Sequence, residues 1–190
     1  MTNTQTTLPL GTISHGTMRV QDTMPALLSA LDGIRLSPED RQTCDEVQQC
    51  LDTWIALDEL FVDAEENILT ELARSAASVD ADDLLFDLEE EMNDTLLPLA
   101  QSYVPDYCYV GSHPGDGSDL GVWPCDELFD DTTQGSYDGD CWRLRENTHP
   151  TEETIPADMS HALAVNDHGN ATLYRRSESR KYWMECWSIV

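Results

Sequence analysis

The sequence predicts an α+β protein in which an N-terminal helical half, containing a long acidic helical hairpin, packs on a small C-terminal antiparallel β-sheet. Two observations predict this class. Apolar residues recur at three- and four-residue steps up to about residue 102, and short aromatic and β-branched runs between turn residues follow. We expect an acidic helical region at 1–102 and a loop-rich region with a β-meander at 103–190, together forming one compact unit.

The first two helices have recognisable boundaries. Thr23 is predicted to cap a short helix that ends at Gly33, a residue type that tolerates a left-handed C-cap. The segment Ser37-Pro38-Glu39-Asp40 then combines an N-cap residue, a proline at the first helical position and two carboxylates in the first turn. This segment predicts the start of a long amphipathic helix that reaches about Ala76.

A third helix is expected from Asp80, with Leu88 and Met92 on its apolar face, and Pro98 is expected to kink it or end it. The short connection Ala77-Ser78-Val79-Asp80 precedes it. The second and third helices are therefore expected to run antiparallel to each other.

Short strands are expected in the C-terminal region, at residues 107–110, 121–123, 162–165, 171–175 and 182–190. The turn at 166–170 contains Asp, Gly and Asn residues, which supply the positive backbone dihedrals that a hairpin needs. The last three strands are therefore predicted to form an antiparallel meander. Residues 127–140 contain few apolar side chains and are expected to be an exposed acidic loop.

The charge of the chain is concentrated in one part of the sequence. Between Glu39 and Asp140 there are 28 acidic and two basic residues, so this stretch holds −26 of the total formal charge of −27. Such a field repels nucleic acid and anionic membranes, and it favours a positively charged partner. No run approaches the roughly 18 to 20 apolar residues of a transmembrane helix, and the polar N-terminus has no secretory pattern. We expect a cytoplasmic protein.

The acidic side chains of the second and third helices fall into stripes. At about 1.5 Å per residue, an acid recurs about every 5 Å along the second helix and about every 3 Å along the third, and one DNA strand presents a phosphate about every 3.4 Å. Like charges at helical spacing cost a few tenths of a kcal/mol per pair, so their accumulation favours a compensating gain in a groove lined with Lys and Arg. The predicted contact residues are Asp80, Asp82, Asp83, Asp87, Glu90, Glu91 and Asp94, with Asp45, Asp52, Glu59 and Glu66 as a second row.

The acidic residues have two further interpretations, which stay open. An acidic helix face is often simply solvated. A large excess of Asp and Glu over a single Lys is also typical of proteins adapted to high salt. In either case the charge serves solubility, and the protein has a structural role.

Residues typical of enzymes and metal sites form only loose patterns. Cys108, His113 and Asp116 are the residue types of a thiol nucleophile, its base and an orienting group, but such roles depend on geometry rather than on closeness in sequence. The zinc-type ligands Cys108, His113, Cys125, Cys141 and His149 match no paired-ligand spacing. A small Cys/His-dependent hydrolase or metal-binding protein is the alternative from another class. We expect no enzyme activity, metal or cofactor, and we expect the six scattered cysteines to be free thiols.

Three islands of sequence resemble uncharacterised acidic proteins carried by bacteriophages, prophages and other mobile elements. They are Gly11-Thr12-Ile13-Ser14-His15-Gly16-Thr17-Met18-Arg19 with Asp22 and Pro25-Ala26-Leu27, Tyr103-Val104-Pro105 with Gly115-Asp116-Gly117, and Val165-Asn166-Asp167-His168-Gly169-Asn170-Ala171-Thr172-Leu173-Tyr174. The resemblance implies a context, because mobile elements carry inhibitors of host restriction and CRISPR systems, several of which are acidic mimics of DNA. It implies no catalytic residue.

Charge and context together predict a non-enzymatic inhibitor of a nucleic-acid-binding defence complex in the cytoplasm of a bacterial host. Its acidic helices are expected to occupy a Lys/Arg-lined DNA-binding groove by DNA mimicry. A CRISPR surveillance complex is the first expected partner and a restriction enzyme the second. Neither direct binding of nucleic acid nor binding to a membrane is expected.

Overall fold

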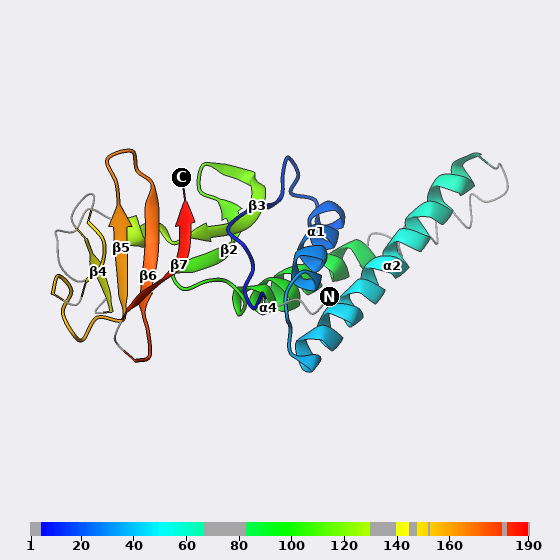
Figure 1. Cartoon of the computed structure of the whole chain (residues 1–190). Helices are drawn as coiled ribbons and strands as arrows, with labels where there is room; N and C mark the ends of the chain where they lie inside the picture. Colours follow the sequence, from blue (N-terminus) through cyan, green and yellow to red (C-terminus); the bar gives the residue numbers. More distant parts are fainter. Residues whose placement is uncertain are drawn as a thin grey trace. The chain divides into compact units, whose positions relative to one another are not determined.

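The computed structural model describes residues 5–66, 83–129, 140–144, 148–151, 153–179 and 182–189, with the side chains of these ranges except those of 58–66 and 127. It confirms the α+β class, because helices lie mostly in the N-terminal half and two small sheets mostly in the C-terminal half (Figure 1). The helical elements are α1 (Val20–Asp32), α2 (Pro38–Glu66), a segment at 83–90 that continues into the π-helix η1 (Glu91–Leu96), α4 (Leu97–Gln101) and the 3-10 helix η2 (Asp126–Phe129). The strands are β1 (Gly11–Ser14), β2 (Cys108–His113), β3 (Asp116–Pro124), β4 (Cys141–Arg143), β5 (His161–Val165), β6 (Ala171–Arg176) and β7 (Trp183–Ile189).

The chain divides into two compact units. Unit 1 contains Met1–Val104 and Cys108–Trp123, and unit 2 contains Pro105–Tyr107 and Pro124–Val190. Unit 1 therefore includes α1, α2, the helix at 83–101 and the sheet of β1, β2 and β3, whereas unit 2 includes the sheet of β4 to β7. The three residues Pro105–Tyr107 belong to unit 2, although segments of unit 1 precede and follow them in the sequence.

The helix α2 begins where the sequence predicts. The Ser37 hydroxyl accepts a hydrogen bond from the Asp40 backbone N–H at 3.0 Å and donates to the Asp40 carboxylate at 2.6 Å, as an N-cap residue does. The Tyr103 hydroxyl donates to the same carboxylate. The hydrogen bonds from Ser37 and Tyr103 lower the pKa of Asp40 from its ordinary value of 3.8. The predicted end near Ala76 lies outside the described residues, as does the connection at 77–80.

The boundaries of α1 differ from the prediction. Thr23 lies inside the first turn, where its hydroxyl donates to the Arg19 carbonyl at 3.2 Å, so it is not the cap. Arg19 and Thr17 both donate to the Asp22 carboxylate at 2.8 Å, which stabilises the entry to the helix and lowers the pKa of Asp22. At the other end, Gly33 has φ −69° and continues the right-handed turn by donating to helix carbonyls, so the expected left-handed C-cap is wrong.

The helix that contains Pro98 continues to Gln101 rather than ending at the proline. In a regular α-helix the proline ring clashes with the carbonyl four residues earlier, and proline has no N–H to donate. The preceding residues form the π-helix η1, in which the Leu97 N–H donates to the Met92 carbonyl five residues earlier. The wider π-turn accommodates the proline, which lies in the first turn of α4.

Unit 1 contains a three-stranded sheet with the order β1-β3-β2. The strand β1 was not predicted, and it pairs antiparallel with β3, with Gly11 opposite Val122. The strands β2 and β3 extend the short runs expected at 107–110 and 121–123. Fully buried side chains from the helices, the sheet and the segment before β1 form the core of the unit; they include Leu8, Met24, Leu27, Leu31, Val47, Leu51, Leu88, Leu96 and Val122.

Unit 2 contains a four-stranded sheet with the order β4-β5-β6-β7. The strands β5, β6 and β7 form the predicted antiparallel meander, and Gly169 in the turn between β5 and β6 has φ +85°. The strand β4 was not predicted and pairs parallel with β5, Cys141 beside His161, so this sheet is mixed. The Ala162 side chain on one face packs in a core cluster with Leu144, Ile155 and Met159.

The expected acidic loop at 127–140 lies mostly outside the described residues. Its described beginning belongs to η2, where Leu128 is buried, so this part is not a solvated loop. The six cysteines are free thiols. Among the helices in the described ranges, none combines the length and the apolar composition that crossing a membrane requires.

Candidate functional site

The predicted contact residues of unit 1 lie at the surface wherever the structure describes their side chains. Asp45, Asp52, Asp83, Asp87, Glu90 and Asp94 are exposed, and Glu91 is half-buried. Asp80 and Asp82 are outside the described residues, and Glu59 and Glu66 belong to the part of α2 whose side chains are not described. We call the seven described carboxylates the acidic array.

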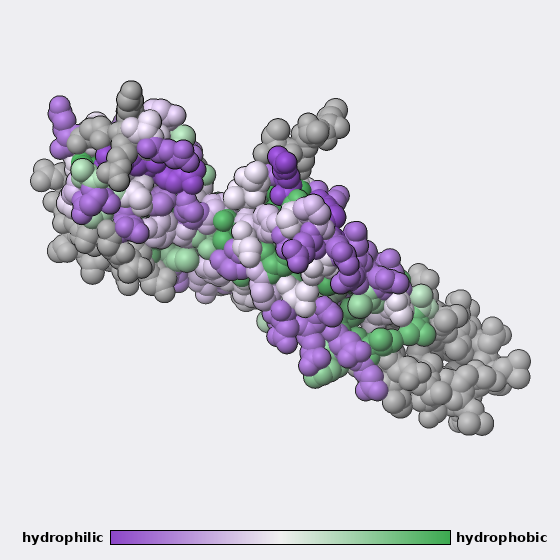
Figure 2. All heavy atoms as spheres, turned by 90° about the horizontal axis from the view of Figure 1, so that it is seen from below, coloured by the Kyte–Doolittle hydropathy of each residue, from purple (hydrophilic) through white to green (hydrophobic). Residues whose placement is uncertain are grey.

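Helical periodicity separates the acidic array from the core. Leu88, Met92, Leu96 and Ala100 are buried at four-residue steps, so they form one face of the helix at 83–101. In α2 the core face includes Val47 and Leu51, and the carboxylates occupy other positions. Figure 2 shows one side of these helices, on which hydrophilic residues in purple flank a narrower hydrophobic strip in green.

The thiol of Cys50 on α2 indicates that carboxylates of both helices lie near one another. Burial is the main cause that raises the pKa of Cys50, and the negative charges of Glu91, Asp87 and Glu46 raise it further. Glu46 belongs to α2, whereas Asp87 and Glu91 belong to the helix at 83–101. Negative charge from two helices therefore acts on a single surface position.

Within the described residues, no Lys, Arg or His side chain forms an ion pair with a carboxylate of the acidic array. Asp52 accepts a hydrogen bond from the Gln48 amide at 2.8 Å, which leaves its charge uncompensated. Arginines of unit 1 pair with other acids, Arg19 with Asp22 and Arg41 with Asp32.

Two arginines near the C-terminus are engaged within unit 2. Arg175 contacts Asp106 at 3.8 Å. Arg176 is buried, donates to the carbonyls of Met159 and Pro156, and lies over the Trp183 ring at 4.5 Å. Their described contacts are therefore with unit 2 and not with the acidic array.

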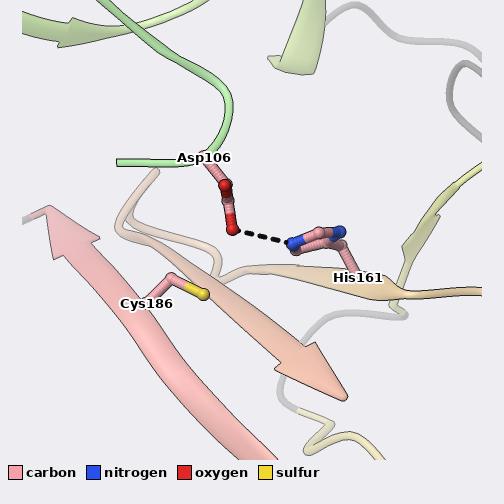
Figure 3. A group of neighbouring side chains, drawn as sticks. All are labelled: Asp106, His161 and Cys186. Atoms are coloured by element: carbon pink, nitrogen blue, oxygen red, sulfur yellow. Dashed lines mark hydrogen bonds and ion pairs between the residues drawn. The ribbon is translucent and has the colours of Figure 1, made fainter. Parts of the chain in front are cut away.

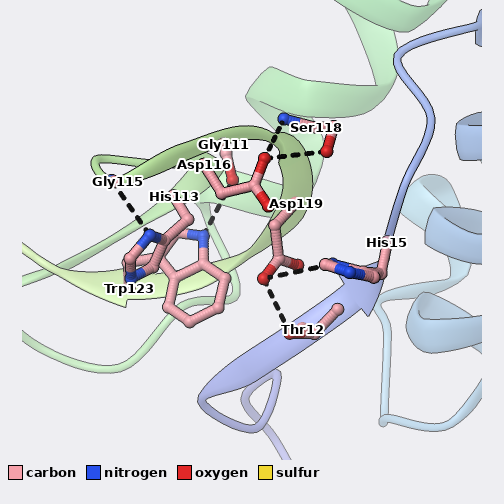
Figure 4. A network of polar contacts seen from close by, with 9 residues as sticks. All are labelled: Thr12, His15, Gly111, His113, Gly115, Asp116, Ser118, Asp119 and Trp123. Atoms are coloured by element: carbon pink, nitrogen blue, oxygen red, sulfur yellow. Dashed lines mark hydrogen bonds and ion pairs between the residues drawn. The ribbon is translucent and has the colours of Figure 1, made fainter.

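The structure does not bring Cys108, His113 and Asp116 together as a catalytic group. Cys108 and His113 are five residues apart on β2, and alternation along a strand places them on opposite faces. The His113 ring packs edge-on against Trp123 with centroids 4.6 Å apart, and its Nδ1 accepts a hydrogen bond from the Gly115 N–H (Figure 4). The geometry therefore disfavours the hydrolase alternative in this region.

The turn after His113 is held by its own polar contacts. The Asp116 carboxylate accepts hydrogen bonds from the Ser118 N–H and hydroxyl, which lower the pKa of Asp116 (Figure 4). Asp119 accepts a hydrogen bond from Thr12 and lies 3.7 Å from the His15 ring. The contact between Thr12 and Asp119 connects β1 to β3, whereas the other Asp119 oxygen, Oδ1, is buried without a hydrogen-bond partner among the described residues.

One group of possible metal ligands was not predicted. Asp106, His161 and Cys186 of unit 2 each direct a ligand atom to the same place, and these atoms lie within 4.8 Å of one another (Figure 3). They come from the segment Pro105–Tyr107, from β5 and from β7. No short motif connects such distant positions, so their convergence depends on the order of the strands.

Comparison of the chain with protein-family models, curated proteins and solved structures gave no significant match. The geometry and the charge of the described residues are therefore the basis for a functional proposal.

Proposed function

We propose that this protein is a non-enzymatic inhibitor of a nucleic-acid-binding defence complex and that it acts by DNA mimicry. The observation that supports this proposal is the acidic array, whose carboxylates lie on two helices with no basic partner among the described residues. A groove lined with Lys and Arg supplies the missing positive charges. A CRISPR surveillance complex is the first expected target and a restriction enzyme the second, because the proteins that the three islands resemble belong to mobile elements, which meet such systems in their hosts.

The physical basis is the exchange of one polyanion for another. Carboxylates accept charge-assisted and bidentate hydrogen bonds from Arg much as phosphate oxygens do. Those of the array are carried by helices whose opposite faces are buried, so little backbone entropy is lost when they bind. Attraction over the Debye length of about 8 Å at physiological salt also accelerates encounter.

Apolar side chains within the array add a contact that charge alone does not provide. Phe86 is 60% exposed and lies on the helix surface one turn from Asp83 and Glu90. Ile55 on α2 is also exposed. An exposed aromatic ring beside carboxylates can pack against the aliphatic part of a partner's Arg while the carboxylates bind the guanidinium, which favours a protein partner over a simple cation.

The test is competition with DNA for purified target complexes. Labelled duplex DNA is bound to CRISPR surveillance complexes and to restriction enzymes, and displacement by this protein is measured as a loss of fluorescence anisotropy. The triple variant Asp83→Lys, Asp87→Lys, Glu90→Lys removes three positions of the array. The control Glu153→Lys, Asp158→Lys, Glu178→Lys makes the same change in net charge at exposed positions of unit 2.

We expect the wild-type protein to displace DNA from at least one complex. Displacement by the array variant is expected to be at least about 100-fold weaker, since close charge pairs at interfaces contribute about 1.5 kcal/mol or more each. The control variant is expected to displace DNA nearly as well as the wild type. Both variants are expected to stay folded, because exposed substitutions cost at most about 0.5 kcal/mol each. Equal inhibition by the two variants, or no displacement from any complex, contradicts the proposal.

A further inference from the structure

We propose that Asp106, His161 and Cys186 form a binding site for a divalent cation of the zinc class in unit 2. This inference is independent of the acidic array, which belongs to unit 1. The three side chains offer one oxygen, one nitrogen and one sulfur ligand, all within 4.8 Å of one another. Tetrahedral Zn²⁺ with bonds of about 2.0 to 2.3 Å needs ligand separations of about 3.3 to 3.6 Å, so the widest separation has to shorten by at most about 1.2 to 1.5 Å to close the site.

The side chains are arranged for a metal rather than for a catalytic relay. The His161 Nε2 lies 3.1 Å from the Asp106 Oδ2, and the Cys186 thiol lies on that same side of the ring (Figure 3). A Cys-His-Asp relay instead needs the thiol at one ring nitrogen and the carboxylate at the other. Here the other nitrogen, Nδ1, contacts the Ser160 hydroxyl at 2.8 Å.

The far side of the His161 ring also has a polar partner. The Ser160 hydroxyl lies 2.8 Å from Nδ1 and also contacts the Asp140 carbonyl at 3.3 Å. When Nε2 binds a metal, Nδ1 carries the ring hydrogen, and Ser160 is then the outer partner that metal-bound histidines ordinarily have.

A β-bulge in β7 determines the position of Cys186. Glu185 is opposite Tyr174 and Trp187 is opposite Leu173, so Cys186 is the additional residue of a β-bulge in β7. The segment of Asp106 is fixed beside it, because the Trp187 indole donates to the Asp106 carbonyl at 2.9 Å. The Tyr107 ring also packs edge-on against His161. The three ligands are thus held by the sheet and by contacts of their own neighbours.

Charged residues around the site have opposite effects on the binding of a cation. Arg175 lies 3.8 Å from Asp106 and opposes a cation, whereas Glu185 favours one. Burial, followed by the charge of Asp106, raises the pKa of Cys186. The buried thiol of Cys141 interacts with Cys186 but does not belong to the group of ligand atoms that lie within 4.8 Å of one another.

The donor set selects the kind of metal. Thiolate and imidazole favour Zn²⁺ and related transition metals over Mg²⁺ and Ca²⁺, which prefer oxygen. Three protein ligands leave a fourth tetrahedral position for water or for a group of a binding partner. The site opens to solvent at Asp106, whose side chain is 46% exposed, while that of His161 is 13% exposed.

The test uses Co²⁺ as a spectroscopic probe in the full-length, reduced and metal-free protein. Thiolate-bound Co²⁺ gives a charge-transfer absorption that carboxylates alone do not give, and Zn²⁺ displaces it. The ligand variants are Cys186→Ser and His161→Gln. The control is Cys50→Ser, since Cys50 is an exposed thiol near the carboxylates of Glu46, Asp87 and Glu91 and offers a thiolate outside unit 2.

We expect one Co²⁺ per chain with a thiolate band in the wild type and in the Cys50 control. The band is expected to disappear in Cys186→Ser, and the affinity to fall more than about tenfold in His161→Gln. No band in the wild type, or a band that depends on Cys50, overturns the proposal. If Cys186→Ser fails to fold, alkylation of the wild type decides: Zn²⁺ must protect Cys186 and leave Cys50 reactive, and equal reactivity of Cys186 with and without Zn²⁺ overturns the proposal.

Discussion

At the scale of the residue, Cys50 is the internal probe of the acidic array. A thiol reacts through its thiolate, so any negative charge nearby that raises its pKa also slows its alkylation. Two of the charges that act on Cys50, Asp87 and Glu91, come from another helix. Its reactivity therefore depends on how closely the two rows of carboxylates lie together.

We predict that Asp87→Lys accelerates alkylation of Cys50 by about two- to fivefold at neutral pH, because a change of two charge units near a surface thiol is worth about 0.5 to 1 kcal/mol. Asp94→Lys is the control, because it makes the same change on the same helix and Asp94 is not among the charges that shift Cys50. The rate is measured with iodoacetamide and mass spectrometry. Identical rates in the two variants indicate that the helices do not bring their charges together.

At the scale of the element, the helix at 83–101 combines a buried face with the charged face that the proposed function uses. Leu88 is 1% exposed and Leu96 is fully buried, so this element is fixed to unit 1 by its apolar side. Phe86 lies on the other side of the same helix and is 60% exposed. The two faces have separable effects, since one determines stability and the other recognition.

We predict that Leu88→Ala lowers the free energy of unfolding by about 2 to 5 kcal/mol, because the substitution leaves a cavity in the core. Phe86→Ala is expected to change stability by less than about 0.5 kcal/mol and to weaken target binding. Urea denaturation followed by circular dichroism measures both changes in stability. A large loss for Phe86→Ala means that its ring is part of the core, and it then cannot be an anchor.

Elements with local signals could be predicted from the sequence, and those that depend on distant partners could not. Ser37 and Pro38 define the start of α2 with neighbouring residues alone. In contrast, β1 is a strand only because β3 pairs with it, and β4 pairs with a strand about 20 residues later. The π-turn before Pro98 is a third case. A kink, a helix end and a wider turn are all compatible with a residue that has no backbone N–H, so the proline alone does not select one of them.

The same distinction applies to the candidate sites. The acidic array follows from spacing within single helices, which is readable in a sequence. The group of Asp106, His161 and Cys186 requires the order of the sheet and a bulge at one position of β7, neither of which has a local signature. Only the structure brings these three residues together.

At the scale of the whole molecule, a formal charge of −27 produces two opposite responses to salt. Repulsion among the carboxylates destabilises the folded protein at low ionic strength, and added salt screens it. The same screening weakens attraction to a cationic groove. Added salt therefore raises the stability of the folded protein and lowers its affinity for the partner.

We predict that raising NaCl from about 0.02 M to about 0.5 M raises the melting temperature and weakens target binding at least tenfold, because the Debye length shortens across this range. Calorimetry and the competition assay measure the two effects. A protein adapted to high salt instead requires molar salt to fold, so full stability at about 0.15 M argues against adaptation to high salt. Binding that does not change with salt contradicts recognition through the acidic array.

The pairing of β1 with β3 delays the completion of unit 1 during synthesis on the ribosome. Gly11 finds its partner only after Val122 has been translated, more than a hundred residues later. At about 5 to 20 residues per second this interval lasts about 5 to 20 seconds. During that time α1 and α2 can form from nearby contacts, but β1 has no strand to pair with. Early release of the nascent chain leaves the backbone hydrogen-bonding groups of β1 unpaired.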